Sequence, residues 1–189
     1  MFWKSDKTYT SSADTLGELL IRTMPVACGS ELGVLQHVWN LSLSDEQQQQ
    51  WLTEFFAFYM FILDRMAFRT WGEKGRQRFT DHLRGRVTKG LDGWPIERLR
   101  QFAATCLQRH GEYEGLQELY PATTPNTPVD VRLQGTLIGR FANILSAQIG
   151  TSERGVLEML VGTVGVSTKA FLKEGVSGLK SRHSLKDVY

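Results

Sequence analysis

The segment from Trp51 to Trp71 contains nine consecutive apolar residues, Phe55 to Leu63, with no turn residue among them. A helix that is apolar on every side must be covered by other parts of the protein. The run is shorter than the roughly 20 residues that a membrane-spanning helix needs, and it is bounded by Glu54 and Asp64. The sequence therefore predicts an all-α fold, a compact bundle in which a central aromatic helix over about 45–71 is buried among the others.

Composition places the chain among globular proteins. It has 189 residues, of which 41% are hydrophobic, so one domain over 1–189 is able to bury about two thirds of its unfolded surface. The formal net charge of +2 is too small to require nucleic acid or an anionic membrane as a partner. Two cysteines, Cys28 and Cys106, make no disulfide framework, and polar residues follow Met1–Lys4 in place of a secretory signal. We therefore expect a cytoplasmic protein without a transmembrane segment.

Capping residues, glycines and prolines divide the chain into six or seven helices. Ser44 followed by Gln47 has the spacing of a capping box, which predicts the start of the central helix. Gly72 and Gly75 predict its end, and Pro25 predicts the end of a short first helix. The expected helices cover 13–23, 30–40, 45–71, 74–89, 95–119, 130–149 and 154–173.

Three segments lack a clear helical pattern. Residues 121–129 are rich in proline and threonine and predict an irregular connection. Residues 129–135 fit either a short strand, because apolar and polar residues alternate there, or the beginning of the next helix. Residues 175–189 contain glycines and lysines and predict a flexible tail, either free or docked on the protein.

Asp64 is the most unusual charge, because it shares a helical face with apolar residues. An unpaired buried carboxylate is strongly unfavourable, so Asp64 needs a partner. One hypothesis is a structural ion pair with an arginine of the following helix, namely Arg76, Arg78 or Arg84. The other hypothesis is that Asp64 lines a pocket and, together with Arg65, anchors a small apolar or aromatic ligand.

The region 64–100 is strongly basic, with ten basic and five acidic residues, and eight of the ten are arginines. Arginine suits bidentate binding of a carboxylate or phosphate. The leading hypothesis is therefore a non-enzymatic interaction, adaptor or regulatory domain that binds a protein partner through this arginine-rich face. The alternative is a solvated helix surface on which the charges pair with one another. The candidate residues are Asp64, Arg65, Arg69, Arg76, Arg78 and Arg84.

Other chemistries have less support. Nucleic-acid binding is a third hypothesis, but the aromatic residues near the arginines also suit the core, and no recognition-helix or zinc-finger pattern occurs. Cys106 and His110 lie four residues apart, a spacing that lets both bind one metal ion. Two ligands do not complete a metal site, and both residues also suit a packed core, so we expect no cofactor. Glu112 and Glu114 lie in a stretch that the pattern predicts to be solvated.

Enzymatic activity is not favoured, because the sequence contains no nucleophile elbow and no phosphate-binding loop. An active site assembled from several helices would leave no such motif. Five tryptophans and ten phenylalanines are also many for one core of this size. Aromatic residues left exposed by that core predict a homodimer.

Overall fold

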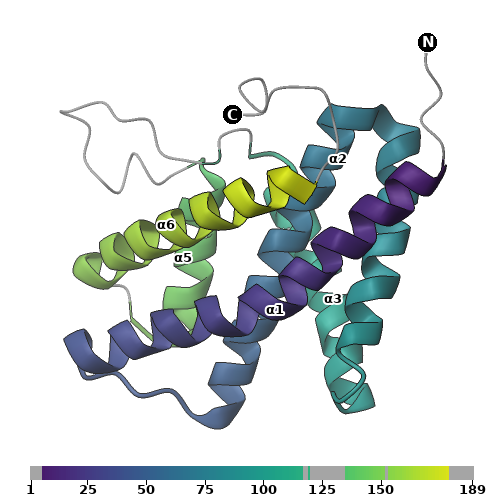
Figure 1. Cartoon of the computed structure of the whole chain (residues 1–189). Coiled ribbons are helices and arrows are strands. Elements are labelled where there is room, and N and C mark those ends of the chain that lie inside the picture. Colours follow the sequence, from purple (N-terminus) through teal and green to yellow (C-terminus); the bar gives the residue numbers. More distant parts are fainter. Residues whose placement is uncertain (1–5, 117–118, 120–134, 152, 179–189) are drawn as a thin grey trace.

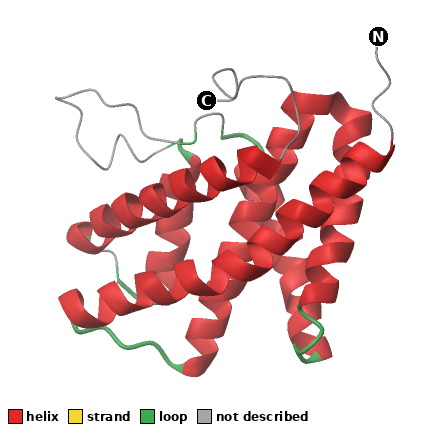
Figure 2. Ribbon diagram, in the orientation of Figure 1, coloured by secondary structure: helices red, strands yellow, loops and turns green. Residues whose placement is uncertain are grey.

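The structure is a computed structural model that describes residues 6–116, 119, 135–151 and 153–178. Helices account for most of these residues (Figures 1 and 2). They are α1 (Asp6–Trp39), α2 (Asp45–Gly90), α3 (Ile96–Tyr113), α5 (Leu137–Gln148) and α6 (Arg154–Gly178). The all-α prediction is confirmed, but the described residues form five helices in place of the expected six or seven.

α2 is a helical hairpin whose two halves run in opposite directions from a turn at Gly72 (Figure 1). The first half, residues 45–71, begins at the predicted capping box: the Ser44 side chain accepts a hydrogen bond from the Gln47 N–H, and the Gln47 side chain accepts one from the Ser44 N–H. Gly72 has φ 69° and ψ −175°, a conformation essentially restricted to glycine. The predicted end of the central helix is therefore confirmed, and the second half, residues 73–90, follows it without a loop.

α1 is one helix, and the prediction of two helices separated at Pro25 is wrong. Proline lacks the N–H that would donate one helical hydrogen bond. The Pro25 ring is exposed, so it does not interrupt packing against the rest of the protein. Leu20, Met24 and Cys28 are buried on both sides of it. This continuous apolar face keeps the helix intact across the proline.

Several other boundaries differ from expectation. α3 ends at Tyr113, before the predicted 119, and it continues through Gly111 without interruption. α6 extends to Gly178, past both the predicted end at 173 and the predicted start of the tail at 175. These differences reflect packing, because Tyr113 and Gly175 are both buried against neighbouring helices.

The predicted helix over 130–149 is described only in its later part. α5 begins at Leu137, where the Thr136 side chain accepts a hydrogen bond from the Gly139 N–H as an N-cap. The connection over 121–129, the choice between strand and helix for most of 129–135, and the tail beyond 178 lie outside the described residues.

The buried apolar side chains form one cluster to which all five helices contribute, with the first half of α2 at its centre. Phe58 of α2 stacks on Phe141 of α5, with ring centroids 4.2 Å apart and ring planes 5° apart. Tyr59, the next residue of α2, meets Phe171 of α6 edge to face at 4.7 Å. The prediction of a buried aromatic helix surrounded by others is confirmed.

α6 lies antiparallel beside α1 (Figure 1). Trp39 Nε1 at the end of α1 donates a hydrogen bond to Met159 Sδ, and Arg22 in the middle of α1 pairs with Glu174. By length and composition, Arg154–Gly175 is apolar enough to cross a membrane, although 33% of its most apolar window is buried in the protein. A core helix meets the same criteria, so the absence of a transmembrane segment stays a prediction.

Candidate functional site

A groove of about 400 Å³ lies near the turn of the α2 hairpin, beside the C-terminal part of α3. It collects most of the residues that the sequence singled out. We call it the arginine groove. It is lined by Phe61, Asp64, Arg65, Phe68, Arg69, Glu73, Arg76, His110 and Glu114.

Asp64 lies at the base of the arginine groove and is only 7% exposed. Its Oδ1 accepts a hydrogen bond from Thr80 Oγ1 at 2.6 Å, and its Oδ2 accepts one from Arg76 Nη1 at 3.1 Å. Both donors belong to the second half of α2, so Asp64 ties the two halves of the hairpin together. Of the three arginines suggested as its partner, Arg76 is the one that forms the ion pair.

Arg76 holds a second carboxylate on its other terminal nitrogen. Its Nη2 donates to Glu73 Oε1 at 2.8 Å, and Gln77 Nε2 donates to the same oxygen at 2.8 Å. Burial alone would lower the pKa of Arg76, but the Glu73 and Asp64 carboxylates outweigh it and raise that pKa above its ordinary value. Arg76 is therefore a permanent cation held between a buried and an exposed carboxylate.

The other cations of the arginine groove are Arg65 and Arg69. The Arg65 guanidinium donates to the backbone carbonyl of Leu116 and lies 5.8 Å from the centre of the Phe61 ring. Arg69 is exposed, and Phe68 between them in sequence is 51% exposed. Guanidinium groups beside an open aromatic face suit a ligand that combines a carboxylate with an apolar or aromatic group.

Phe68 also bears on the homodimer prediction. Among the large apolar side chains that are exposed in the described part of the chain, Phe68 is aromatic and the others are aliphatic. One aromatic ring does not amount to a dimer interface, so a homodimer stays a prediction. The exposed residues are Val26, Val38, Phe68, Ile96, Leu107 and Val166.

Arg78 and Arg84, the remaining two candidates, do not line the arginine groove. Both are exposed on the second half of α2. Residues four or eight positions apart share a helix face, so Arg84 lies on the same side as Arg76, further along the hairpin, whereas Arg78 points elsewhere. The predicted arginine face is thus divided, and only part of it forms a concave site.

Cys106 and His110 do lie together, as their spacing predicts, around a small cavity of about 20 Å³ that Arg84 and Asp64 also line. This space holds roughly one water molecule. Burial raises the pKa of Cys106 to about 12, an effect that Arg84 opposes, so the free thiol is protonated at neutral pH. No group of three metal-binding side chains occurs within the described residues.

An ion network centred on the buried Glu54 joins α2, α3 and α5, and it was not among the predicted sites. Arg109 Nε and Nη2 donate to the two oxygens of Glu54, both at 2.7 Å, and its Nη1 donates to Glu112 at 2.5 Å. Arg140 pairs with the other oxygen of Glu112 at 2.9 Å, and Gln148 donates to Glu54 at 3.1 Å. The prediction that Glu112 is solvated is therefore wrong. Arg109 and Glu112 are three residues apart, but Glu54, Arg140 and Gln148 come from other helices, so only the position of Glu54 at the edge of an apolar run pointed to a buried charge.

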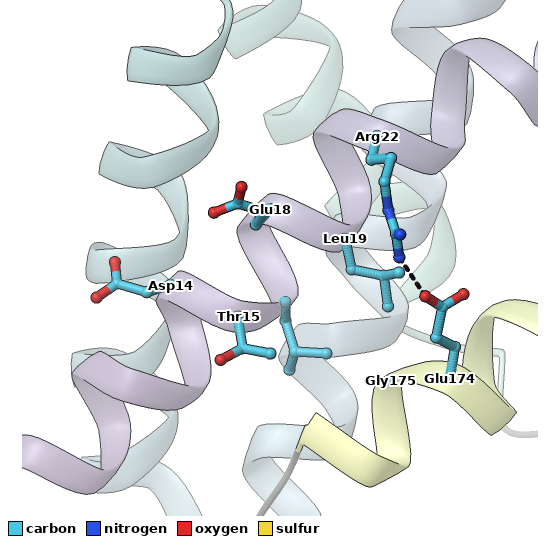
Figure 3. Close-up of a pocket in the computed structure, with 8 residues that line it drawn as sticks. Asp14, Thr15, Glu18, Leu19, Arg22, Glu174 and Gly175 are labelled. Carbon is cyan, nitrogen blue, oxygen red and sulfur yellow. Dashed lines mark hydrogen bonds and ion pairs between the residues drawn. The ribbon is translucent and has the colours of Figure 1, made fainter.

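A second groove, of about 530 Å³, lies between the first part of α1 and the end of α6 (Figure 3). An ion pair of Arg22 with Glu174 crosses it. Glu18 is paired with Arg86 at 2.9 Å, and Figure 3 shows Glu18 and Asp14 pointing away from α6. The acidic residues here do not converge on one point. The groove is lined by Asp14, Thr15, Leu16, Glu18, Leu19, Arg22, Glu174 and Gly175.

Glu31 is a buried carboxyl between α1 and α6, with 2% of the residue exposed. Ser167 Oγ donates to its Oε1 at 3.5 Å, and its Oε2 is buried without a hydrogen-bond partner among the described residues. Burial raises the pKa of Glu31, and hydrogen bonds from Thr163 and Ser167 oppose that effect only in part. Nearby, burial and then Glu31 raise the pKa of the Cys28 thiol to about 12.

Comparison of the chain with protein-family models, with curated proteins and with solved structures finds no match. No relative therefore supplies a function.

Proposed function

We propose that the protein is a non-enzymatic interaction domain that binds an anionic segment of a partner protein in the arginine groove. The observation that carries this proposal is the convergence of Arg65, Arg69 and Arg76 on one concave surface beside the exposed ring of Phe68. Arginine and aromatic residues are enriched at the energetically important positions of protein interfaces.

The charge around the groove supports an anionic partner. Asp64 is buried and already bonded to Thr80 and Arg76, so it adds little negative charge at the surface. The lining of the groove has three arginines and three carboxylates, so the positive surplus comes from the region around it. The whole region 64–100 has a surplus of five positive charges, which would steer an acidic segment toward the groove.

The size of the groove favours the binding of a short segment and not of a broad, flat protein surface. About 400 Å³ accommodates one or two side chains and the backbone between them. A carboxylate placed among the arginines and an apolar side chain placed on Phe68 would fill the groove. The partner expected from this chemistry is an extended segment in which glutamate or aspartate is adjacent to an aromatic residue.

The same volume favours a second candidate, a small-molecule ligand, because typical ligand pockets begin at about 300 Å³. The predicted anchor Asp64 is already bonded to Thr80 and Arg76, so the arginines would be the anchor for such a ligand. The ligand expected is then a carboxylate with an aromatic ring, not a purely apolar molecule. Nucleic-acid binding stays a third hypothesis.

Binding of the labelled peptide acetyl-Glu-Glu-Phe-Glu-Glu-amide, measured by fluorescence anisotropy, tests the proposal. Arg69→Glu reverses an exposed charge in the groove, and Lys173→Glu makes the same change of net charge on α6. We expect Arg69→Glu to weaken binding roughly tenfold, or about 1.4 kcal/mol, and Lys173→Glu to leave it unchanged.

Two results would contradict the proposal. One is equal affinity of the wild-type protein and both variants for the peptide. The other is equal affinity of the wild-type protein for the peptide and for a version with glutamine in place of every glutamate. Arg76→Glu is unsuitable for this test, because it would place a second carboxylate against the buried Asp64.

A further inference from the structure

We propose that Glu73 is an internal occupant of the arginine groove, and that a carboxylate of the partner protein displaces it from Arg76 on binding. This inference rests on the proposed function and adds two residues to it. Arg76 binds the carboxylate of the partner, and Glu73 competes with that carboxylate for Arg76. It follows from three properties of Arg76 and its two carboxylates.

The first property is the different exposure of the two carboxylates. The Asp64 side chain is 9% exposed and has a second donor, Thr80, so it is fixed in place. The Glu73 side chain is 49% exposed and pairs with Arg76 three residues away in the same helix, and its second donor, Gln77, is itself exposed. Exposed pairs of this kind contribute little to stability, because water competes for both partners. A carboxylate of the partner can therefore replace Glu73 on Arg76, but it cannot replace Asp64.

The second property is an unused donor on Arg76. Its Nη1 donates to Asp64 and its Nη2 to Glu73, but its Nε is buried and has no acceptor among the described residues. The Nε–H and Nη2–H bonds of a guanidinium lie on the same edge and point in parallel. A carboxylate that faces this edge accepts both hydrogen bonds, which is a preferred geometry for arginine and carboxylate. Glu73 uses only one oxygen on Nη2 and leaves this arrangement incomplete.

The third property is the position of Glu73 in the groove. It follows directly after Gly72, at the turn of the hairpin, and lines the same groove as Phe68 and Arg69. A segment seated on Phe68 would therefore place its carboxylate where the Glu73 side chain now lies. The exchange replaces one hydrogen bond to Arg76 with two, and it lets Glu73 return to water.

Glu73 is thus expected to lower the affinity of the groove for weakly matched anions. A segment must compete with it for Arg76, so segments that satisfy both Nε–H and Nη2–H are favoured over single charges. The partner class is an acidic protein segment with a carboxylate directly beside an aromatic residue.

Removal of the internal carboxylate tests this inference. Glu73→Gln keeps the size of the side chain and abolishes its charge. Glu97→Gln is a matched control, because Glu97 is also exposed and pairs with an arginine, Arg100, three residues away, but lies outside the groove. We expect Glu73→Gln to tighten binding of acetyl-Glu-Glu-Phe-Glu-Glu-amide about threefold to tenfold, and Glu97→Gln to have no effect.

A second measurement observes the exchange directly. In a spectrum of the arginine side chains of the ¹⁵N-labelled protein, the Nε–H signal of Arg76 should move downfield when the peptide binds, because Nε gains an acceptor. The inference is overturned if Glu73→Gln and Glu97→Gln bind the peptide equally, or if the Arg76 signal does not move at saturation. If Glu73→Gln binds phenylacetate more tightly than the wild-type protein does, but does not bind the peptide more tightly, the proposal that the partner is a protein segment is overturned.

The failure of this inference is distinguishable from failure of the proposed function. If the peptide binds the wild-type protein and Arg69→Glu abolishes binding, the groove is the site even where Glu73→Gln has no effect. If Arg69→Glu has no effect and the glutamine peptide binds equally well, the proposed function itself is wrong, whatever the behaviour of Glu73→Gln.

Discussion

Arg109 of α3 binds Glu54 of α2 through two hydrogen bonds of equal length, 2.7 Å, beside an apolar core. The Glu54 side chain is 3% exposed and the Arg109 side chain 13%. Hydrogen bonding to Glu54 holds the pKa of Arg109 above its ordinary value, so Arg109 stays charged. This pair fixes the position of α3 against the first half of α2, and α3 supplies one wall of the arginine groove.

Removal of one partner of this pair should be strongly destabilising. Glu54→Ala leaves the guanidinium of Arg109 buried without its main acceptor, and we expect a loss of about 3–5 kcal/mol in the free energy of unfolding. Urea denaturation measures it. Arg100→Ala, which breaks an exposed ion pair with Glu97, should cost at most about 1 kcal/mol. Similar losses in the two variants would show that the buried pair has no special structural role.

The stacked pair of Phe58 and Phe141 should be equally important to the core. Phe141→Ala removes a fully buried ring that lies 4.2 Å from Phe58, and the expected cost is about 3–5 kcal/mol. Phe68→Ala removes a ring that is 51% exposed and should change stability by about 0.5 kcal/mol or less. Thermal and urea unfolding of the two variants compare them directly, and a larger loss in Phe68→Ala would mean that Phe68 packs in the core.

The turn of the α2 hairpin should require glycine at position 72. Gly72→Ala forces a Cβ into φ 69° and ψ −175°, and we expect it to cost about 1–3 kcal/mol. Gly85→Ala lies in a regular part of the second half, with no atom within 4 Å of the added Cβ, and should stabilise the protein by about 0.4–1 kcal/mol. If both substitutions stabilise the protein, the hairpin does not turn at Gly72.

Glu31 should make stability depend on pH. Its folded-state pKa is raised above the ordinary value of 4.5 because burial disfavours the charged form. The folded state therefore binds the proton more tightly than the unfolded state. Stability from this group is fully present below about pH 4.5 and is lost as the pH rises through the folded-state pKa.

Glu31→Gln removes that titration. The free energy of unfolding of the variant relative to wild type should rise with increasing pH and then level off above the folded-state pKa. Urea denaturation of both proteins from pH 4 to pH 9 measures the difference, which cancels the titration of the other groups. A difference that does not change with pH would mean that Glu31 ionises equally in the folded and unfolded states.

Local sequence features predicted the parts of the fold that depend on neighbouring residues. The aromatic run, the capping box at Ser44 and the turn at Gly72 each act over a few residues, and all three were confirmed. The pairing of Asp64 with an arginine of the following helix could also be predicted, because a hairpin brings residues on either side of its turn together. The rule that proline ends a helix failed at Pro25, because tertiary packing outweighed the loss of one backbone hydrogen bond.

Features that depend on contacts between residues far apart in the chain could not be predicted from the sequence. Glu54 and Arg109 are 55 residues apart, and nothing local to either marks the other as its partner. Glu112 was assigned to solvent although one of its partners, Arg109, is only three residues away, because the burial of this pair depends on Glu54 and Arg140 of other helices. The division of the arginine-rich face could not be predicted either. It depends on α3, whose C-terminal part lines the arginine groove together with Arg65, whereas Arg78 lies outside the groove.

Chemical-shift mapping locates the binding site of the peptide on the protein. Backbone amide spectra of the ¹⁵N-labelled protein are recorded during titration with acetyl-Glu-Glu-Phe-Glu-Glu-amide. We predict that the shifted signals cluster in residues 64–76 and 110–116, which surround the arginine groove, and that Arg69→Glu abolishes these shifts. Shifts confined to α1 and α6, or no shifts at a peptide concentration that saturates other acidic-segment binders, would contradict the assignment of the groove as the binding site.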